Sequence, residues 1–177
     1  MEHDDFIVLL EDILTEGLEK RLKVREAEAG DLGLAMPLST PLGVELTLTR
    51  HGGRVLVRGA VRGAATLECS RCLAGFSHPV ETELETHLEI GEKKTADADG
   101  ELAPEELDVQ QIKNGRIDLR ELIAEQVHLA VPLKPLCSEG CRGLCPHCGA
   151  DLNTESCSCE GGQTDPRWDA LKHLKEQ

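Results

Sequence analysis

Eight cysteines are the residues of this 177-residue chain best suited to chemistry, and they fall into two groups. The first group is a single Cys-x-x-Cys pair, Cys69 and Cys72, between two strand-like runs. The second lies towards the C-terminus and contains Cys137, Cys141, Cys145, Cys148, Cys157 and Cys159. Closely spaced thiols bind soft metal ions, exchange disulfides or form structural disulfides, so spacing and compartment must decide between these uses.

The C-terminal group contains a zinc-knuckle pattern. Structural zinc takes four tetrahedral ligands, commonly as two close pairs. In "LCPHCG" the proline stiffens the turn between Cys145 and Cys148, and Gly149 permits a positive φ that lets backbone N–H groups face the thiolates. Cys157 and Cys159 supply the second pair. Our first-choice metal site is therefore formed by these four cysteines, and because four thiolates leave no open position, we expect structural zinc.

The other cysteines leave alternatives open. Cys137 and Cys141 either replace the second pair of that site or form a second site with Cys69 and Cys72. Thiol exchange is an alternative for Cys69 and Cys72 because Arg71 beside them would lower a thiol pKa, although redox pairs usually lie where a strand enters a helix. An iron–sulfur cluster is a further alternative, which the knuckle spacing favours less.

The ends and composition of the chain indicate a reducing compartment. No run of about 18 apolar residues could span a membrane. The N-terminus "MEHDDFIVLLEDILTEGLEK" is acidic where a secretory signal begins with basic residues. We therefore expect a cytoplasmic protein with no membrane association, in which structural disulfides are disfavoured.

Charge and aromatic content indicate the class of partner. The net charge is −14, and residues 81–108 hold eleven acidic residues against two lysines. Phe6, Phe76 and Trp168 are the only aromatic residues. Nucleic-acid binding depends on basic side chains and, for single strands, on aromatic stacking. We therefore expect no DNA binding, leave direct RNA binding open, and favour a basic protein as partner.

The periodicity predicts an α+β fold with a central antiparallel β-sheet of about four or five short strands packed by helices. A brief extended start at 6–8 precedes an amphipathic helix within 5–22, and period-two alternation begins at Val44 and continues through the "HGG" turn. Further strand-like runs, "GAATLEC" and "HPVETELETHLEI", follow. Residues 91–108 are predicted to form an acidic solvated loop.

Two further helices complete the prediction. In "IDLRELIAEQVHLAVPLKP", Asp118 can cap a helix, Glu121 is its capping-box partner and Pro132 ends it. In "TDPRWDALKHL", Asp165 is a candidate N-cap of a terminal helix. We expect a core domain over 1–136 and a cysteine-rich metal-binding tail with its C-terminal helix over 137–177.

Several segments together resemble the YceD family, the bacterial large ribosomal RNA subunit accumulation proteins, a domain-of-unknown-function family. These are "VLVRGAVRGAATLECSRCLAGFSHPVE", "IDLRELIAEQVHLAVPLKPLC" and "CRGLCPHCGADLN", with the "DPRWDALKHL" end. The resemblance covers the chain in order from about Leu9 to Leu174. It implies a protein needed for normal accumulation of large-subunit ribosomal RNA, and family genes commonly neighbour one for a small zinc-binding ribosomal protein.

Composition and resemblance together favour a ribosome biogenesis factor that binds a basic large-subunit ribosomal protein or a pre-ribosomal particle. Phosphate-binding loops, nucleophile elbows, zinc-protease helices and dinucleotide fingerprints do not occur in the sequence, so we expect no enzyme. The alternatives are an RNA-processing enzyme and a thiol-redox or metal-sensing protein that uses Cys69 and Cys72.

Overall fold

A computed structural model describes residues 5–91, 110–112 and 114–159, and the chain divides into two compact units. The first unit comprises Met1–Leu67 and Phe76–Leu133, and the second comprises Glu68–Gly75 and Lys134–Gln177. All eight cysteines belong to the second unit. The boundary after Leu133 lies near the one expected at 136/137, while residues 68–75 group with the C-terminal segment.

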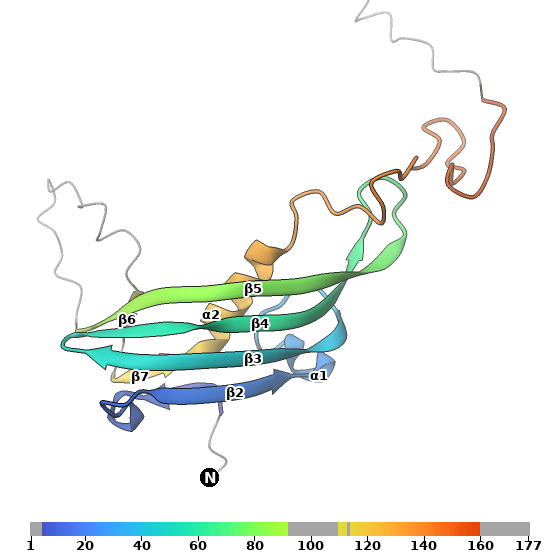
Figure 1. Ribbon diagram of the computed structural model, residues 1–177. Helices are drawn as coiled ribbons and strands as arrows, with labels where there is room; N and C mark the ends of the chain where they lie inside the picture. Colours follow the sequence, from blue (N-terminus) through green and yellow to red (C-terminus); the bar gives the residue numbers. More distant parts are fainter. Residues whose placement is uncertain (1–4, 92–109, 113, 160–177) are drawn as a thin grey trace, which may run out of the picture. The chain divides into compact units, whose positions relative to one another are not determined.

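The first unit is built on a five-stranded sheet in the order β2-β3-β4-β5-β6, whose strands β2 to β5 lie side by side in Figure 1. Antiparallel pairing joins β2 to β3 and β3 to β4, whereas the short β6 runs parallel to β5. The strands are β2 (Leu18–Val24), β3 (Leu38–His51), β4 (Arg54–Glu68), β5 (Gly75–Ile90) and β6 (Gln110–Ile112).

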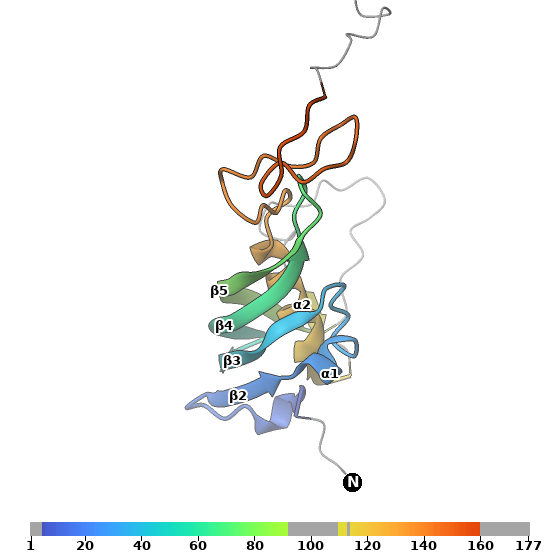
Figure 2. The same ribbon diagram turned by 90° about the vertical axis from the view of Figure 1, so that its right-hand side faces the viewer.

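The remaining elements of this unit are short apart from one helix. Strands β1 (Ile7–Leu9) and β7 (Arg116–Asp118) form an antiparallel pair of their own. A 3-10 turn, η1 (Leu10–Asp12), follows β1, and a single-turn helix, α1 (Glu26–Ala29), follows β2. The main helix is α2 (Leu119–Ala130), which crosses one face of the sheet, as the turned view of Figure 2 shows.

Side-chain alternation explains why the sheet has one covered face. Val44, Leu46 and Leu48 of β3 are buried, and register pairs Val44 with the buried Val61 of β4. On α2 the buried residues are Leu119, Leu122, Ile123, Ala124 and Val127. The opposite face of β4 and β5 carries the exposed ion pairs Arg54–Glu89, Arg58–Glu85 and Arg62–Glu81. The core therefore lies between the sheet and its helix.

The predicted multi-strand sheet is confirmed, in a fold of mostly strands and few helices, and it differs from the predicted α+β arrangement in two respects. Strands β3 to β5 are 14 to 16 residues long rather than short, and β6 is parallel rather than antiparallel. Long strands are possible here because β3 and β4 are joined by the tight "HGG" turn and stay in register over most of their length.

The helix predicted within 5–22 is wrong. The chain forms β1, η1 and then β2, whose burial alternates residue by residue. Gly17 has φ +90, a conformation that interrupts a helix, and Leu22 pairs with Val44 on β3. The leucines spaced at helical intervals also fit a period of two over Leu18–Val24, and pairing with a long neighbouring strand decides between them.

The N-cap Asp118 and the helix end before Pro132 are confirmed, whereas the capping-box role of Glu121 stays a prediction. The Asp118 side chain accepts a hydrogen bond from the backbone N–H of Arg120, and the helix ends at Ala130, before Pro132. The predicted acidic loop, apart from Gly91, and the predicted terminal helix lie outside the described residues. Among the described helices, none is long and apolar enough to cross a membrane.

Candidate metal centres

The turn at Cys69–Cys72 is a hydrogen-bonded knuckle. The backbone N–H of Cys69 donates to the carbonyl of Ala74 at 2.9 Å, and the N–H of Leu73 donates back to the carbonyl of Cys69 at 2.9 Å. Leu73 takes a positive φ of 60°, which turns the chain so that backbone N–H groups face the sulfurs. The pair is therefore built as a ligand turn.

The turn at Cys145–Cys148 has the same construction. The N–H of Cys145 donates to the carbonyl of Ala150 at 2.8 Å, and the N–H of Gly149 donates to the carbonyl of Cys145 at 2.9 Å. Gly149 has φ +75, as expected from the sequence, and occupies the position that Leu73 holds in the other knuckle. The two turns are thus equivalent, which the sequence conceals because only one of them carries the glycine.

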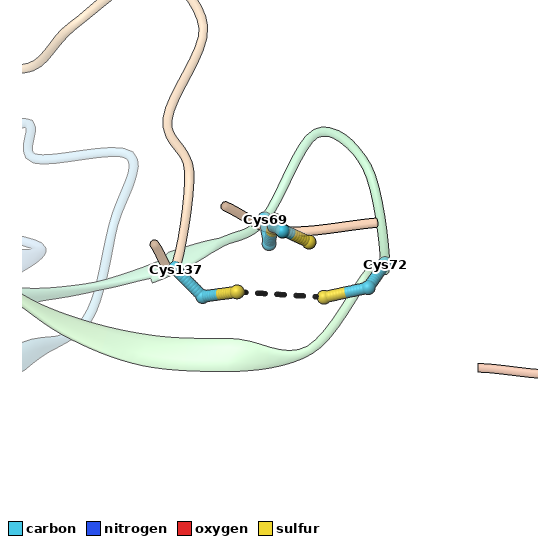
Figure 3. Close-up of side chains that lie close together, drawn as sticks. Cys69, Cys72 and Cys137 are labelled. Atoms are coloured by element: carbon cyan, nitrogen blue, oxygen red, sulfur yellow. Dashed lines mark hydrogen bonds between the residues drawn. The ribbon is translucent and has the colours of Figure 1, made fainter. Parts of the chain in front are cut away.

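Four cysteines from distant parts of the sequence meet in the first cluster, which we define as Cys69, Cys72, Cys137 and Cys141. Their sulfurs all lie within 4.8 Å of one another. The Sγ atoms of Cys69 and Cys141 are 3.8 Å apart, and those of Cys72 and Cys137 are 3.7 Å apart, facing each other in Figure 3. Of the two arrangements left open by the sequence, the structure brings together the one in which Cys137 and Cys141 join Cys69 and Cys72.

The second cluster comprises Cys145, Cys148, Cys157 and Cys159, the four residues of the first-choice site. Their sulfurs also lie within 4.8 Å of one another. Cys145 is buried, Cys157 is half-buried, and Cys148 and Cys159 are exposed. The second cluster is therefore more open to solvent than the first, in which three of four cysteines are buried.

Both clusters have the donor set of a tetrahedral thiolate site, and in the first the two sulfur–sulfur distances can be compared with those of such a site. Four sulfurs each about 2.3 Å from a central zinc ion are about 3.8 Å apart. The two distances of 3.8 and 3.7 Å in the first cluster match this separation. A cluster of several irons would hold the cysteine sulfurs further apart, because iron and inorganic sulfur lie between them. Each cluster could therefore hold one metal ion.

Backbone N–H groups make one sulfur of the first cluster acidic. The N–H of Cys137, followed by those of Cys72 and Arg71, lowers the pKa of the Cys69 thiol to about 6, although burial raises it. The pKa of Cys72 is raised to about 12, because burial and the neighbouring sulfurs outweigh the Ala74 N–H. The pKa of Cys137 is also raised: the Cys72 thiol lowers it, but the Cys69 sulfur and burial prevail.

The same pattern recurs in the second cluster. The N–H groups of Cys148 and His147 lower the pKa of Cys145 to about 6. The pKa of Cys159 is raised to about 12 by the sulfur of Cys148, by burial and by the sulfur of Cys145. The pKa of Cys157 is raised because the Cys145 sulfur and burial outweigh the N–H of Cys159. Each cluster thus has one acidic thiol beside thiols that only a cation would deprotonate at neutral pH.

The Arg71 side chain, singled out in the sequence for its charge, bonds to backbone carbonyls of the C-terminal segment. Its guanidinium donates to the carbonyl of Cys141 at 2.7 Å and to that of Glu139 at 3.3 Å. The pKa of Cys69 is lowered by backbone N–H groups, that of Cys137 first and that of Arg71 included. The side chain ties the C-terminal segment to the knuckle. Thiol exchange by Cys69 and Cys72 stays a prediction.

Leu144 and Asn153, two residues whose hydrogen bonds support the clusters, were not identified from the sequence. The carbonyl of Arg71 accepts from the N–H of Leu144 at 3.1 Å, which places the segment between the two clusters against the first knuckle. The side chain of Asn153 donates to the Cys141 sulfur at 3.5 Å. The Asp-x-Asn spacing, in which Asp151 accepts from the Asn153 N–H at 2.9 Å, was the available local signal.

Comparison with known proteins gives a consistent result. The family model of YceD, described as large ribosomal RNA subunit accumulation protein YceD, matches residues 57–175. A maize protein named large ribosomal RNA subunit accumulation protein YCED homolog 1, chloroplastic, is 33% identical over 165 residues, covering 76% of this chain and 56% of its own. An uncharacterized protein of Mycobacterium bovis is 31% identical over 144 residues, covering 80% and 65%.

A more distant relative is the uncharacterized protein YlbN of Bacillus subtilis, 27% identical over 118 residues, or 66% of this chain and 64% of that protein. The chain spans 56% of the length of the maize relative and 65% of that of the Mycobacterium bovis relative. No solved structure matches the chain. The family match includes both cysteine clusters, strands β5 to β7 and most of β4, and the chain belongs to the YceD family of large ribosomal RNA subunit accumulation proteins.

Proposed function

We propose that this protein is a cytoplasmic ribosome biogenesis factor that supports the synthesis, processing or stability of large-subunit ribosomal RNA. The observation that carries the proposal is the family match over residues 57–175, together with the name of the maize relative. In this proposal the protein works by binding and catalyses no reaction. RNA accumulation is then a consequence of its association with another component of the ribosome.

The partner that we propose is a basic ribosomal protein of the large subunit, free or within a pre-ribosomal particle. The net charge of −14 supports this choice because it repels the phosphate backbone of RNA and attracts a cationic protein. Long-range attraction of this kind raises the association rate most strongly at low salt. Direct contact with RNA is not required by the proposal.

An acidic groove in the first unit gives this partner a candidate docking place. The groove has a volume of about 1240 Å³ and is lined by α1, the turn after it and α2. Its charged lining residues are Glu28, Asp31, Asp118, Glu121 and Glu125, with Arg120 and His128. Glu28 and Asp118 already pair with arginines, which leaves Asp31, Glu121 and Glu125 as the acids best able to receive basic side chains.

For the second unit we propose one structural zinc ion in each cluster. The fit of the donor sets, eight cysteine thiols in two groups of four, supports this choice. Bound zinc supplies charge neutralisation and four strong bonds, which hold a segment with few apolar residues in a defined shape. The cysteines themselves position the chain, and their saturated coordination leaves no position for a substrate.

Affinity purification of the full chain from cells tests the partner. We expect a basic large-subunit protein to be recovered at physiological salt, and recovery to fall in the triple variant Asp31→Asn, Glu121→Gln, Glu125→Gln. A matched control removes three exposed acids elsewhere, with Glu11→Gln, Glu16→Gln and Glu19→Gln, and should leave recovery unchanged. If the purified protein bound ribosomal RNA tightly at physiological salt and bound no large-subunit protein, the proposed partnership would be wrong.

A further inference from the structure

Asn153 links the two cysteine clusters directly. It lies in the chain segment that joins Cys148 to Cys157 of the second cluster, yet its Nδ2 donates to the Sγ of Cys141, a member of the first cluster, at 3.5 Å. A hydrogen bond donated to the sulfur of a metal ligand orients that ligand and tunes its affinity for the metal. The segment closed by one cluster therefore stabilises a ligand of the other.

The orientation of this side chain is held by its other bonds. The Oδ1 of Asn153 accepts from the backbone N–H of Arg142 at 2.8 Å, next to Cys141 in the chain. The Oδ1 of Asp151 accepts from Nδ2 of Asn153 at 2.7 Å and from its backbone N–H at 2.9 Å. Because both ends of the amide have partners, the direction of the N–H towards the sulfur is specified by the network.

Backbone contacts hold the same two segments together. Leu144 and Asp151 form an antiparallel bridge, and the N–H of Leu152 donates to the carbonyl of Gly143 at 2.9 Å. The segment 149–156 thus lies against 141–144. It is flanked in sequence by Cys148 and Cys157 of the second cluster. When the second cluster closes around an ion, both ends of this segment are fixed. The chain entropy lost in bringing Asn153 to Cys141 is then smaller, because the loop is already closed.

We infer that the two clusters bind metal cooperatively, with Asn153 as the positioning residue that couples them. This inference rests on the proposal that both clusters bind zinc. Bonds to a metal ligand from outside the coordination sphere typically change metal affinity by about 10–100-fold. Coupling between binding sites is reciprocal, so an ion in either cluster raises the affinity of the other by the same factor.

Zinc affinities of four full-length proteins test the inference: the wild type, Asn153→Ala, Cys148→Ser/Cys157→Ser, and the combination. Competition with a chelator gives the affinity of each cluster. We expect the loss of the second cluster to weaken zinc binding by the first about tenfold or more. Asn153→Ala should produce a similar loss, and the combined variant should show no further loss because both changes remove the same contact.

Two more variants separate the contact from general damage. Asn153→Asp keeps the acceptor for the Arg142 N–H but replaces the Nδ2 donor with an oxygen that repels a thiolate, so we expect a larger loss than with alanine. Thr154→Ala removes a neighbouring hydroxyl that bonds to the Asp151 carbonyl and should leave both affinities unchanged. Far-UV circular dichroism reports whether the strands of the first unit remain folded in every variant.

The outcomes distinguish the coupling through Asn153 from the proposal that both clusters bind zinc. If the wild type binds two zinc ions but Asn153→Ala and Asn153→Asp bind them as tightly, the coupling through Asn153 is refuted while the two zinc sites stand. Independent, additive losses in the combined variant would also refute it. If the wild type binds fewer than two zinc ions per chain, the zinc proposal fails and the coupling fails with it.

Discussion

Gly143 offers a sharp test of how the segment between the clusters is held. It has φ +76, and a Cβ at this position would lie 2.9 Å from the carbonyl oxygen of Arg71 and 3.3 Å from the Arg71 Cβ. The same carbonyl accepts the 3.1 Å hydrogen bond from the N–H of Leu144. In Gly143→Ala the backbone must therefore move away from the first knuckle, and that hydrogen bond must lengthen or break.

The expected cost follows from these contacts. A left-handed conformation costs a residue with a side chain about 1–2 kcal/mol, offset by about 0.5–1 kcal/mol because alanine loses less backbone entropy than glycine on folding. Losing the Leu144 hydrogen bond adds about 1 kcal/mol. The sum is about 2 kcal/mol, and since metal binding and folding of a small site are coupled, zinc affinity should fall roughly 30-fold.

Gly149→Ala is the matched control for the contact with Arg71. Gly149 has nearly the same φ, +75, but a Cβ there meets no heavy atom within 4 Å. Only the backbone terms then remain, so zinc affinity should fall only a few-fold, for a cost of about 0.5–1 kcal/mol. Chelator competition on both variants measures the difference. Equal losses in the two variants, or no loss in Gly143→Ala, would refute the role given to the Arg71 carbonyl.

Other expectations concern the stoichiometry, the pH dependence and the sheet. At saturating zinc, Cys72→Ser should remove one zinc ion per chain and Cys148→Ser the other, as measured by elemental analysis. If either single variant kept both ions, the two four-cysteine sites would be contradicted. Zinc binding at pH 7.5 should release at least two protons per ion, because each cluster has two thiols of raised pKa, and zinc affinity should therefore rise with pH. Calorimetry in buffers of different ionisation enthalpy measures the release. Fewer than one proton per ion would contradict thiolate coordination by all four cysteines. Gly59→Ala should destabilise the first unit by about 1–3 kcal/mol in urea unfolding, because its Cβ would overlap the Glu45 carbonyl oxygen on β3. Gly43→Ala is the control and should be tolerated, because the nearest neighbour of its Cβ is 3.8 Å away. Similar unfolding midpoints for the two variants would argue against this close packing of the strands.

Elements whose signals lie within a few residues were predicted well. The alternation of Val44, Leu46 and Leu48 identified the buried face of β3, and Asp118 and Pro132 marked the ends of α2. Each of these signals depends on local backbone geometry and on which side chains avoid water, and both are properties of a short stretch of sequence. The cysteine spacing likewise identified a knuckle at Cys145–Cys148 from its proline and glycine.

Tertiary structure decided the features that join distant segments. The leucines before Val24 suit a helix or a strand, and only pairing with β3 selects the strand. Leu73 carries no glycine-like signal, so its knuckle conformation follows from its place in the turn between β4 and β5. The partners of Cys69 and Cys72 are more than 60 residues away in sequence, and no local pattern specifies them. The sequence by itself determined which residues could be ligands and which faces are buried, because these depend on residue type and spacing. Which thiols share a site, and which amide supports them, depends on how the folded chain brings remote segments together, and only the tertiary structure decided that.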